Sequence, residues 1–206
     1  DPARGVFILA ILAVFIGGSL TLFALRAPSL KAGGLFATVS REGGLVLNNL
    51  LLSAACAAVF IGTLYPLALE TLTGEKISVG APYFNLTFGP IFMPLLLLVP
   101  LGPMLTWKRA DVMASLRRLW WAAAAALALT LVVLALVLRG PWLAPLGVAL
   151  GFWLMLGSAA ELVQRIGLGS QPLNIVWARL KGLPRSAFGT ALAHGGLGLL
   201  VIGVII

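Results

Sequence analysis

The chain has 206 residues, of which 61% are hydrophobic and only 10% are charged. Soluble globular domains carry about 25% charged residues, so this composition excludes an ordinary soluble protein and indicates an integral membrane protein. The formal net charge of +8 fits binding to nucleic acid or to anionic lipid, and the distribution of charge along the chain must decide between them.

Six apolar runs are long enough to cross a bilayer, which requires about 20 mostly apolar residues per helix. The runs cover residues 5–25, 45–69, 86–106, 119–138, 142–162 and 186–206. The third contains several prolines, which remove backbone donors and predict a bent helix. We predict an all-α integral membrane protein, with six transmembrane helices in a bundle that forms a single transmembrane domain over residues 1–206. Because the chain begins without Met and ends inside an apolar run, we expect a fragment of a larger multi-pass protein.

The connections between the runs differ in character. Residues 70–85 are polar and rich in turn-forming glycine and proline, and residues 164–184 are predicted as a further loop. Residues 107–118 form a short basic linker with the composition of an interfacial helix. Glu161 and Arg165 lie four residues apart, a spacing that favours an ion pair on one helix over a catalytic role for the carboxylate.

Lysine and arginine are distributed unevenly between the two sides that six crossings define. One side carries Arg26, Lys31, Arg41, Lys108, Arg109, Arg117, Arg118, Arg165, Arg179, Lys181 and Arg185. The other side carries only Arg4, Lys76 and Arg139. The positive-inside rule places the richer side in the cytoplasm, so Asp1 and residues 70–85 face outward. The basic charge therefore reflects topology and contact with membrane lipid, not nucleic acid.

The only histidine, His194, lies inside the last apolar run. An ionisable side chain is costly to place in a membrane and is a functional candidate by default. Its helical neighbours would be Thr190, Ala191, Leu197 and Gly198, mostly small, which predicts a shallow groove open to a flat macrocycle or to another helix. Imidazole is a common iron ligand. The alternative is a hydrogen bond across helices or simple packing, because small residues also permit close helix contacts.

Five separated stretches of the chain resemble one protein family and occur in the expected order. They are residues 1–9, 40–52, 62–66, 74–85 and 193–195. Together they resemble the large membrane subunit of the bacterial cytochrome c maturation system, the CcmF-type haem lyase component, in the part that follows its tryptophan-rich segment. The resemblance extends over nearly all of the chain.

This resemblance implies part of a haem lyase (cytochrome c synthetase) complex in the bacterial inner membrane, with the Asp1 side periplasmic. Such a complex takes haem from a periplasmic haem chaperone and attaches it to apocytochrome c, together with thiol-handling maturation subunits. By resemblance, His194 is one axial ligand of a membrane haem b, binds its iron, and so contributes to a reductant. The family's tryptophan-rich motif and its other haem-ligating histidines are absent from this sequence. We therefore expect no catalytic residue here and no activity from this chain alone.

Two other classes of function are compatible with the residues. A transporter or channel fragment would use the proline-rich third span, with Asn48 and Asn49, as its binding determinants. A structural membrane subunit without a cofactor would use His194 only in packing. If the chain takes part in haem maturation, we expect the outward segment 70–85 to contact periplasmic partners. Replacement of Lys76 and Tyr83 would test this contact.

Overall fold

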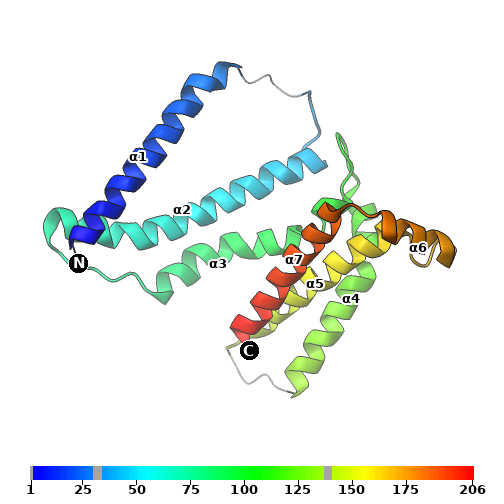
Figure 1. Cartoon of the computed structure of the whole chain (residues 1–206). Coiled ribbons are helices and arrows are strands. Elements are labelled where there is room, and N and C mark those ends of the chain that lie inside the picture. Colours follow the sequence, from blue (N-terminus) through cyan, green and yellow to red (C-terminus); the bar gives the residue numbers. More distant parts are fainter. Residues whose placement is uncertain (1, 30–33, 137–140) are drawn as a thin grey trace. The chain divides into compact units, whose positions relative to one another are not determined.

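A computed structural model of the chain describes residues 2–29, 34–136 and 141–206. Regular structure within these ranges is entirely helical, which confirms the predicted all-α class. The helices are α1 (Pro2–Arg26), α2 (Arg41–Thr73), α3 (Ala81–Leu98), α4 (Val112–Leu136), α5 (Ala144–Ile166), α6 (Leu173–Gly182) and α7 (Arg185–Ile205), with short 3-10 helices η1 (Ala27–Ser29) and η2 (Gly102–Met104) (Figure 1).

Among the described residues, six helices are long and apolar enough to cross a membrane, and they correspond to the six predicted spans. They are α1 to α5 and α7, the third span including the short turn after α3. Several helices extend past the apolar runs because helical propensity does not stop where hydrophobic composition does. The linker 107–118, for example, supplies the first turns of α4 from Val112 and is not a separate interfacial helix.

Two further differences concern helix ends. α3 continues through Pro90 and Pro94 but ends at Leu98, two residues before Pro100, so the predicted third span is helical over less than its length. The segment predicted as the last loop contains α6, a helix of 10 residues. Asp1, Lys31, Arg139 and the last two residues of the predicted fourth span lie outside the described residues.

The chain divides into two compact units. Unit 1 comprises residues 1–35 and 49–92, and unit 2 comprises residues 36–48 and 93–206. In unit 1, α1 contacts α2 near Gly5, where a Cβ would lie 2.5 Å from a Leu67 methyl group. Unit 2 contains α4, α5, α6 and α7, and it holds His194.

Helix α5 lies between α4 and α7 and is the best buried helix of unit 2 (Figure 1). Towards α4, the core consists of the buried residues Met104, Leu119, Ala122 and Ala160. The indole of Trp153 packs against this cluster, and its Nε1 donates a hydrogen bond to the Leu97 carbonyl oxygen at 3.0 Å. This bond occupies a carbonyl in the last turn of α3, where helical hydrogen bonding ends.

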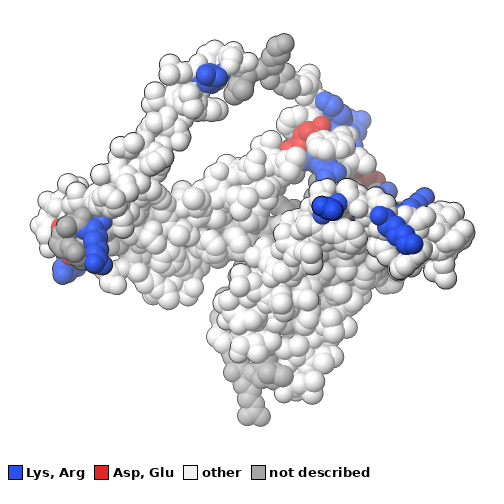
Figure 2. All heavy atoms as spheres, in the orientation of Figure 1, with Lys and Arg blue, Asp and Glu red and all other residues white. Residues whose placement is uncertain are grey.

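The basic residues of unit 2 that the structure describes gather at one end of its helices. α4 begins, α5 ends and α7 begins at this end, because neighbouring helices run antiparallel. In Figure 2, the blue lysine and arginine atoms of unit 2 lie at this end. The fold thus brings together charges that are widely separated in sequence.

Candidate functional site

His194 lies in the first half of α7, and its side chain is half-buried. The buried residues Ala187, Ala191 and Gly198 mark the face of α7 that packs inside unit 2. The helical period places His194 on this same face, between Ala191 and Gly198. The described residues offer its imidazole no hydrogen-bond or ion-pair partner. An imidazole in that position is available to a ligand.

Glycines allow α7 to approach α5 closely. A Cβ on Gly198 would lie 2.5 Å from the Gly151 carbonyl oxygen, and a Cβ on Gly151 would lie 2.8 Å from the Gly198 carbonyl oxygen. One turn before Gly151, a side chain on Gly147 would overlap Ile205. The pattern Gly147-x-x-x-Gly151 is the small-residue spacing that lets membrane helices pack backbone to backbone. α5 therefore determines the position of α7, and with it that of His194.

A groove with a cavity volume of about 290 Å³ lies between α5 and α7. It is lined by Met155, Ser158, Ala159 and Leu162 of α5 and by Phe188, Ala191, Leu192 and Gly195 of α7. Ser158 is the one polar side chain of this lining, and its hydroxyl donates to the Leu154 carbonyl oxygen at 2.7 Å. The groove is therefore apolar, and two of its lining residues, Ala191 and Gly195, flank His194 in the sequence.

The glycines next to His194 face open space. A Cβ at Gly195 or Gly196 would meet no atom within 4 Å, in contrast to Gly198. Packing within the described part of the chain therefore does not require glycine at these two positions. At about 100° per residue, Gly195 is the one of the two that adjoins the imidazole, and its missing side chain leaves space there for a planar ligand or for a helix that is not part of this chain.

His194 is not part of a cluster of side chains that could chelate a metal ion in the described part of the chain. Within residues 2–29, 34–136 and 141–206, no group of three or more His, Cys, Asp or Glu side chains is placed to hold a metal. A protein-bound haem iron needs only one or two axial ligands from the protein. One imidazole in an apolar setting can supply one such ligand, with the other coming from elsewhere.

The predicted ion pair between Glu161 and Arg165 is confirmed. Arg165 Nη2 lies 2.7 Å and its Nε 2.9 Å from the same Glu161 carboxylate oxygen. The Glu161 side chain is only 6% exposed, so a buried carboxylate is matched by a cation on its own helix. This pairing favours the structural role for Glu161.

Residues at the beginning of the stretch 40–52 form a packing joint at the start of α2. The sequence did not predict this structural role. The fully buried Ser40 accepts a hydrogen bond from the Gly43 amide at 3.0 Å and so caps α2. The Glu42 carboxylate accepts a hydrogen bond from the Lys108 amide at 2.8 Å. Lys108 adopts a φ of 65°, an uncommon conformation for a residue other than glycine, and this bond helps to hold it.

A second joint brings together the stretches 62–66 and 74–85. The Tyr83 hydroxyl donates to the Ala58 carbonyl oxygen at 2.9 Å. The Tyr83 ring covers Gly62, where a Cβ would lie 2.6 Å from a ring carbon. Tyr83 is thus a packing residue of α3 and not, as the sequence led us to expect, part of an exposed contact loop.

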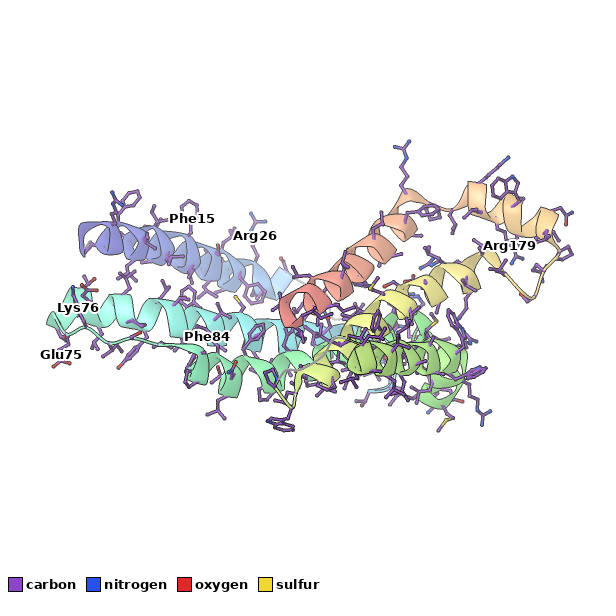
Figure 3. The ribbon with its side chains drawn as sticks, turned by 90° about the horizontal axis from the view of Figure 1, so that it is seen from below. Phe15, Arg26, Glu75, Lys76, Phe84 and Arg179 are labelled. Carbon is purple, nitrogen blue, oxygen red and sulfur yellow. The ribbon has the colours of Figure 1, made fainter. Side chains whose placement is uncertain are left out.

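The non-helical part of that connection is confined to residues 74–80, most of which are exposed. Lys76 lies here with its side chain 80% exposed and its Nζ 3.4 Å from a Glu70 carboxylate oxygen. Figure 3 shows Glu75 and Lys76 where α2 gives way to the connection that leads to α3. An exposed ion pair of this kind contributes little to stability, so both charges are available to a partner.

Comparison with known proteins identifies relatives over the whole chain. It is 59% identical over 205 residues to the cytochrome c-type biogenesis protein CycK of Rhizobium meliloti, covering 100% of this chain and 30% of the relative. It is 49% identical over 208 residues to the cytochrome c-type biogenesis protein ccl1 of Rhodobacter capsulatus, with 99% and 30% covered. It is 36% identical over 212 residues to the cytochrome c-type biogenesis protein CcmF of Escherichia coli, with 99% and 30% covered.

The chain spans about 30% of the length of the curated relatives it matches, in agreement with the expected piece of a larger protein. No family model matches the chain. No solved structure matches it either.

Proposed function

The chain belongs to the family of cytochrome c-type biogenesis proteins that includes CycK and CcmF, and from this premise we propose that His194 is one axial ligand of a haem b. The observation that carries the proposal is the environment of this histidine. It is the only one in the chain, it is half-buried on an apolar helix, and open space adjoins it at Gly195.

Other residues of this chain fix the position of the imidazole and provide its apolar surroundings. The close contact between Gly151 and Gly198 holds α7 against α5 and so limits the movement of His194. Apart from Ser158, the groove beside this part of α7 is lined by apolar residues, so it suits the apolar body of a macrocycle. If His194 held a haem there, the group would supply single-electron transfer, as a reductant requires.

We extend the proposal to the whole protein, which would take haem from a periplasmic chaperone for attachment to apocytochrome c, assisted by thiol-handling subunits. This rests on the relatives, which are named cytochrome c-type biogenesis proteins. The proposed location is the bacterial inner membrane, which the apolar helices and the bacterial relatives support. The basic end of unit 2 would face the cytoplasm and residues 74–80 the periplasm.

The exposed connection at residues 74–80 would then be a contact site for a periplasmic partner. A photoactivatable cross-linker attached at position 76, through Lys76→Cys in the full-length protein, should give an adduct with the haem chaperone. The same probe at Arg109→Cys, on the basic end of unit 2, is the control and should give none. Equal adducts at both positions, or none at position 76, would contradict this contact.

A specific observation supports a competing role in packing. His194 lies on the face of α7 that carries Ala187, Ala191 and Gly198, all of which are buried. If His194 serves only to fill this face, its replacement changes stability and leaves any bound haem unaltered. The spectrum of the haem therefore distinguishes the two roles.

The test compares dithionite-reduced absorption spectra of the full-length protein, with haem quantified per polypeptide. His194→Ala should lose most of its haem b, or convert it to a high-spin form that added imidazole returns to low spin. Thr190→Ala is the matched control, because the exposed Thr190 hydroxyl bonds only to the Ser186 carbonyl oxygen of its own helix. It should retain the wild-type spectrum. A wild-type spectrum from His194→Ala would assign the residue to packing.

A further inference from the structure

Helix α6 is too short to cross a membrane, yet it connects two helices that can. Its 10 residues span roughly 15 Å, about half the hydrocarbon thickness of a bilayer. It lies between the end of α5 and the beginning of α7, so both of its ends are held at the same end of unit 2 (Figure 1). If α5 and α7 cross the bilayer, α6 is held at the membrane surface.

One face of α6 is apolar and only partly covered by the protein. Leu173, Val176, Trp177 and Leu180 follow the spacing that places residues on one side of a helix. Val176 is buried, but Leu173 is 79% exposed and Trp177 is 59% exposed. The described part of the chain therefore covers one portion of this stripe and leaves a leucine and a tryptophan uncovered.

The charge around α6 is positive. Arg179 and Lys181 lie in its last turn, and Arg185 begins the next helix. The sequence contains no acidic residue after Glu161. The Lys181 ammonium group lies 5.5 Å from the centre of the Trp177 ring, so a cation adjoins the exposed aromatic residue. Figure 3 shows Arg179 on α6 beside the turn that follows α5.

We propose that α6 is an interfacial helix that binds the anionic phospholipids of the bilayer surface. Leu173 and Trp177 enter the boundary between headgroups and acyl chains, where tryptophan is favoured. Arg179 and Lys181 lie at the level of the phosphate groups and bind them electrostatically. A lipid surface buries the exposed side chains of Leu173 and Trp177 and also pairs with the adjacent cations. The connections to α5 and α7 hold the helix at that surface.

The test uses the full-length protein, with its native cysteines replaced by serine, reconstituted into vesicles. An environment-sensitive fluorophore is attached through Leu173→Cys, on the uncovered part of the stripe. The matched control is Ala178→Cys, which is exposed on the other side of the same helix. The vesicles contain phosphatidylglycerol and phosphatidylethanolamine, with a fraction of lipids that carry a nitroxide quencher near the headgroup.

We expect lipid quenching at position 173 to exceed that at position 178 several-fold. Replacing Arg179 and Lys181 together by Gln should reduce the quenching in anionic vesicles and have little effect in vesicles of phosphatidylcholine alone, since each basic residue near an anionic surface contributes about fivefold to binding. Equal quenching at the two positions would overturn the proposal. A blue-shifted emission at position 173 without lipid quenching would also overturn it, because protein and not lipid would then cover the stripe.

Discussion

A contact with a residue outside its own helix requires glycine at position 43. A Cβ at this position would overlap the Thr38 carbonyl oxygen, and the cap formed by Ser40 holds the backbone there. Alanine normally stabilises a helix interior by about 0.5–1 kcal/mol relative to glycine. Overlap in a packed region costs about 1–3 kcal/mol, so the clash should prevail. We expect Gly43→Ala to lower the thermal unfolding temperature of the full-length protein in detergent.

The neighbouring Gly44 provides the control for this prediction. A Cβ there would lie 3.3 Å from the end of the Leu105 side chain, which can move. Gly44→Ala should therefore unfold near the wild-type temperature. Equal unfolding temperatures for the two variants would show that the approach to Thr38 does not constrain Gly43.

Among the contacts of single residues, those between near neighbours in sequence could be predicted and those between distant residues could not. The ion pair between Glu161 and Arg165 was predictable because the two residues lie four apart on one helix. The bond between Tyr83 and Ala58 joins residues 25 apart, and the bond between Glu42 and Lys108 joins residues 66 apart. Only the path of the chain in space brings such partners together.

At the scale of elements, the contact between α5 and α7 is the one on which the proposed haem site depends. A methyl group on Gly198 would meet the Gly151 carbonyl oxygen, whereas a methyl group on Gly196 would meet nothing within 4 Å. We therefore expect Gly198→Ala to lose about 1–3 kcal/mol of stability, because the helices must separate. Gly196→Ala should be neutral or slightly stabilising.

Thermal unfolding of the full-length protein measures both variants of α7, and haem per polypeptide is recorded alongside. If α5 positions His194, Gly198→Ala should also retain less haem than Gly196→Ala. A more stable Gly198→Ala would mean that α7 can move away from α5 without cost. Unchanged haem in a destabilised Gly198→Ala would separate the helix contact from the proposed ligand site.

The long helices were predictable because crossing a bilayer imposes a minimum apolar length that few other structures meet. Their ends were not, since the first turns of α4 and the last turn of α2 are polar enough to read as loops. α6 was also missed, although Pro172 before it and an apolar stripe of period 3.6 along it were visible in the sequence. Because α6 is short and contains basic residues, its sequence resembled that of a loop.

For the molecule as a whole, the distribution of charge predicts the topology. Positive residues near the ends of spans favour the cytoplasmic side, so residues 74–80 should be periplasmic and the basic end of unit 2 cytoplasmic. In a background that carries Cys56→Ser and has no other cysteine, a membrane-impermeant maleimide should label Lys76→Cys in intact spheroplasts. It should label Arg109→Cys only after the membrane is permeabilised, with at least about tenfold less labelling before. The reverse pattern would invert the proposed orientation.

The sequence by itself determined that this chain is an α-helical membrane protein with six spans, one basic side and one histidine within an apolar helix. These properties depend on composition and on spacing within single segments, which hydrophobic length and charge report directly. Only the tertiary structure decided which glycines permit helix contact, which face of α7 meets α5, and that the motifs around Ser40 and Tyr83 are packing joints. Those properties depend on close contacts between residues far apart in the chain, and steric fit between distant segments leaves no periodic signal in the sequence.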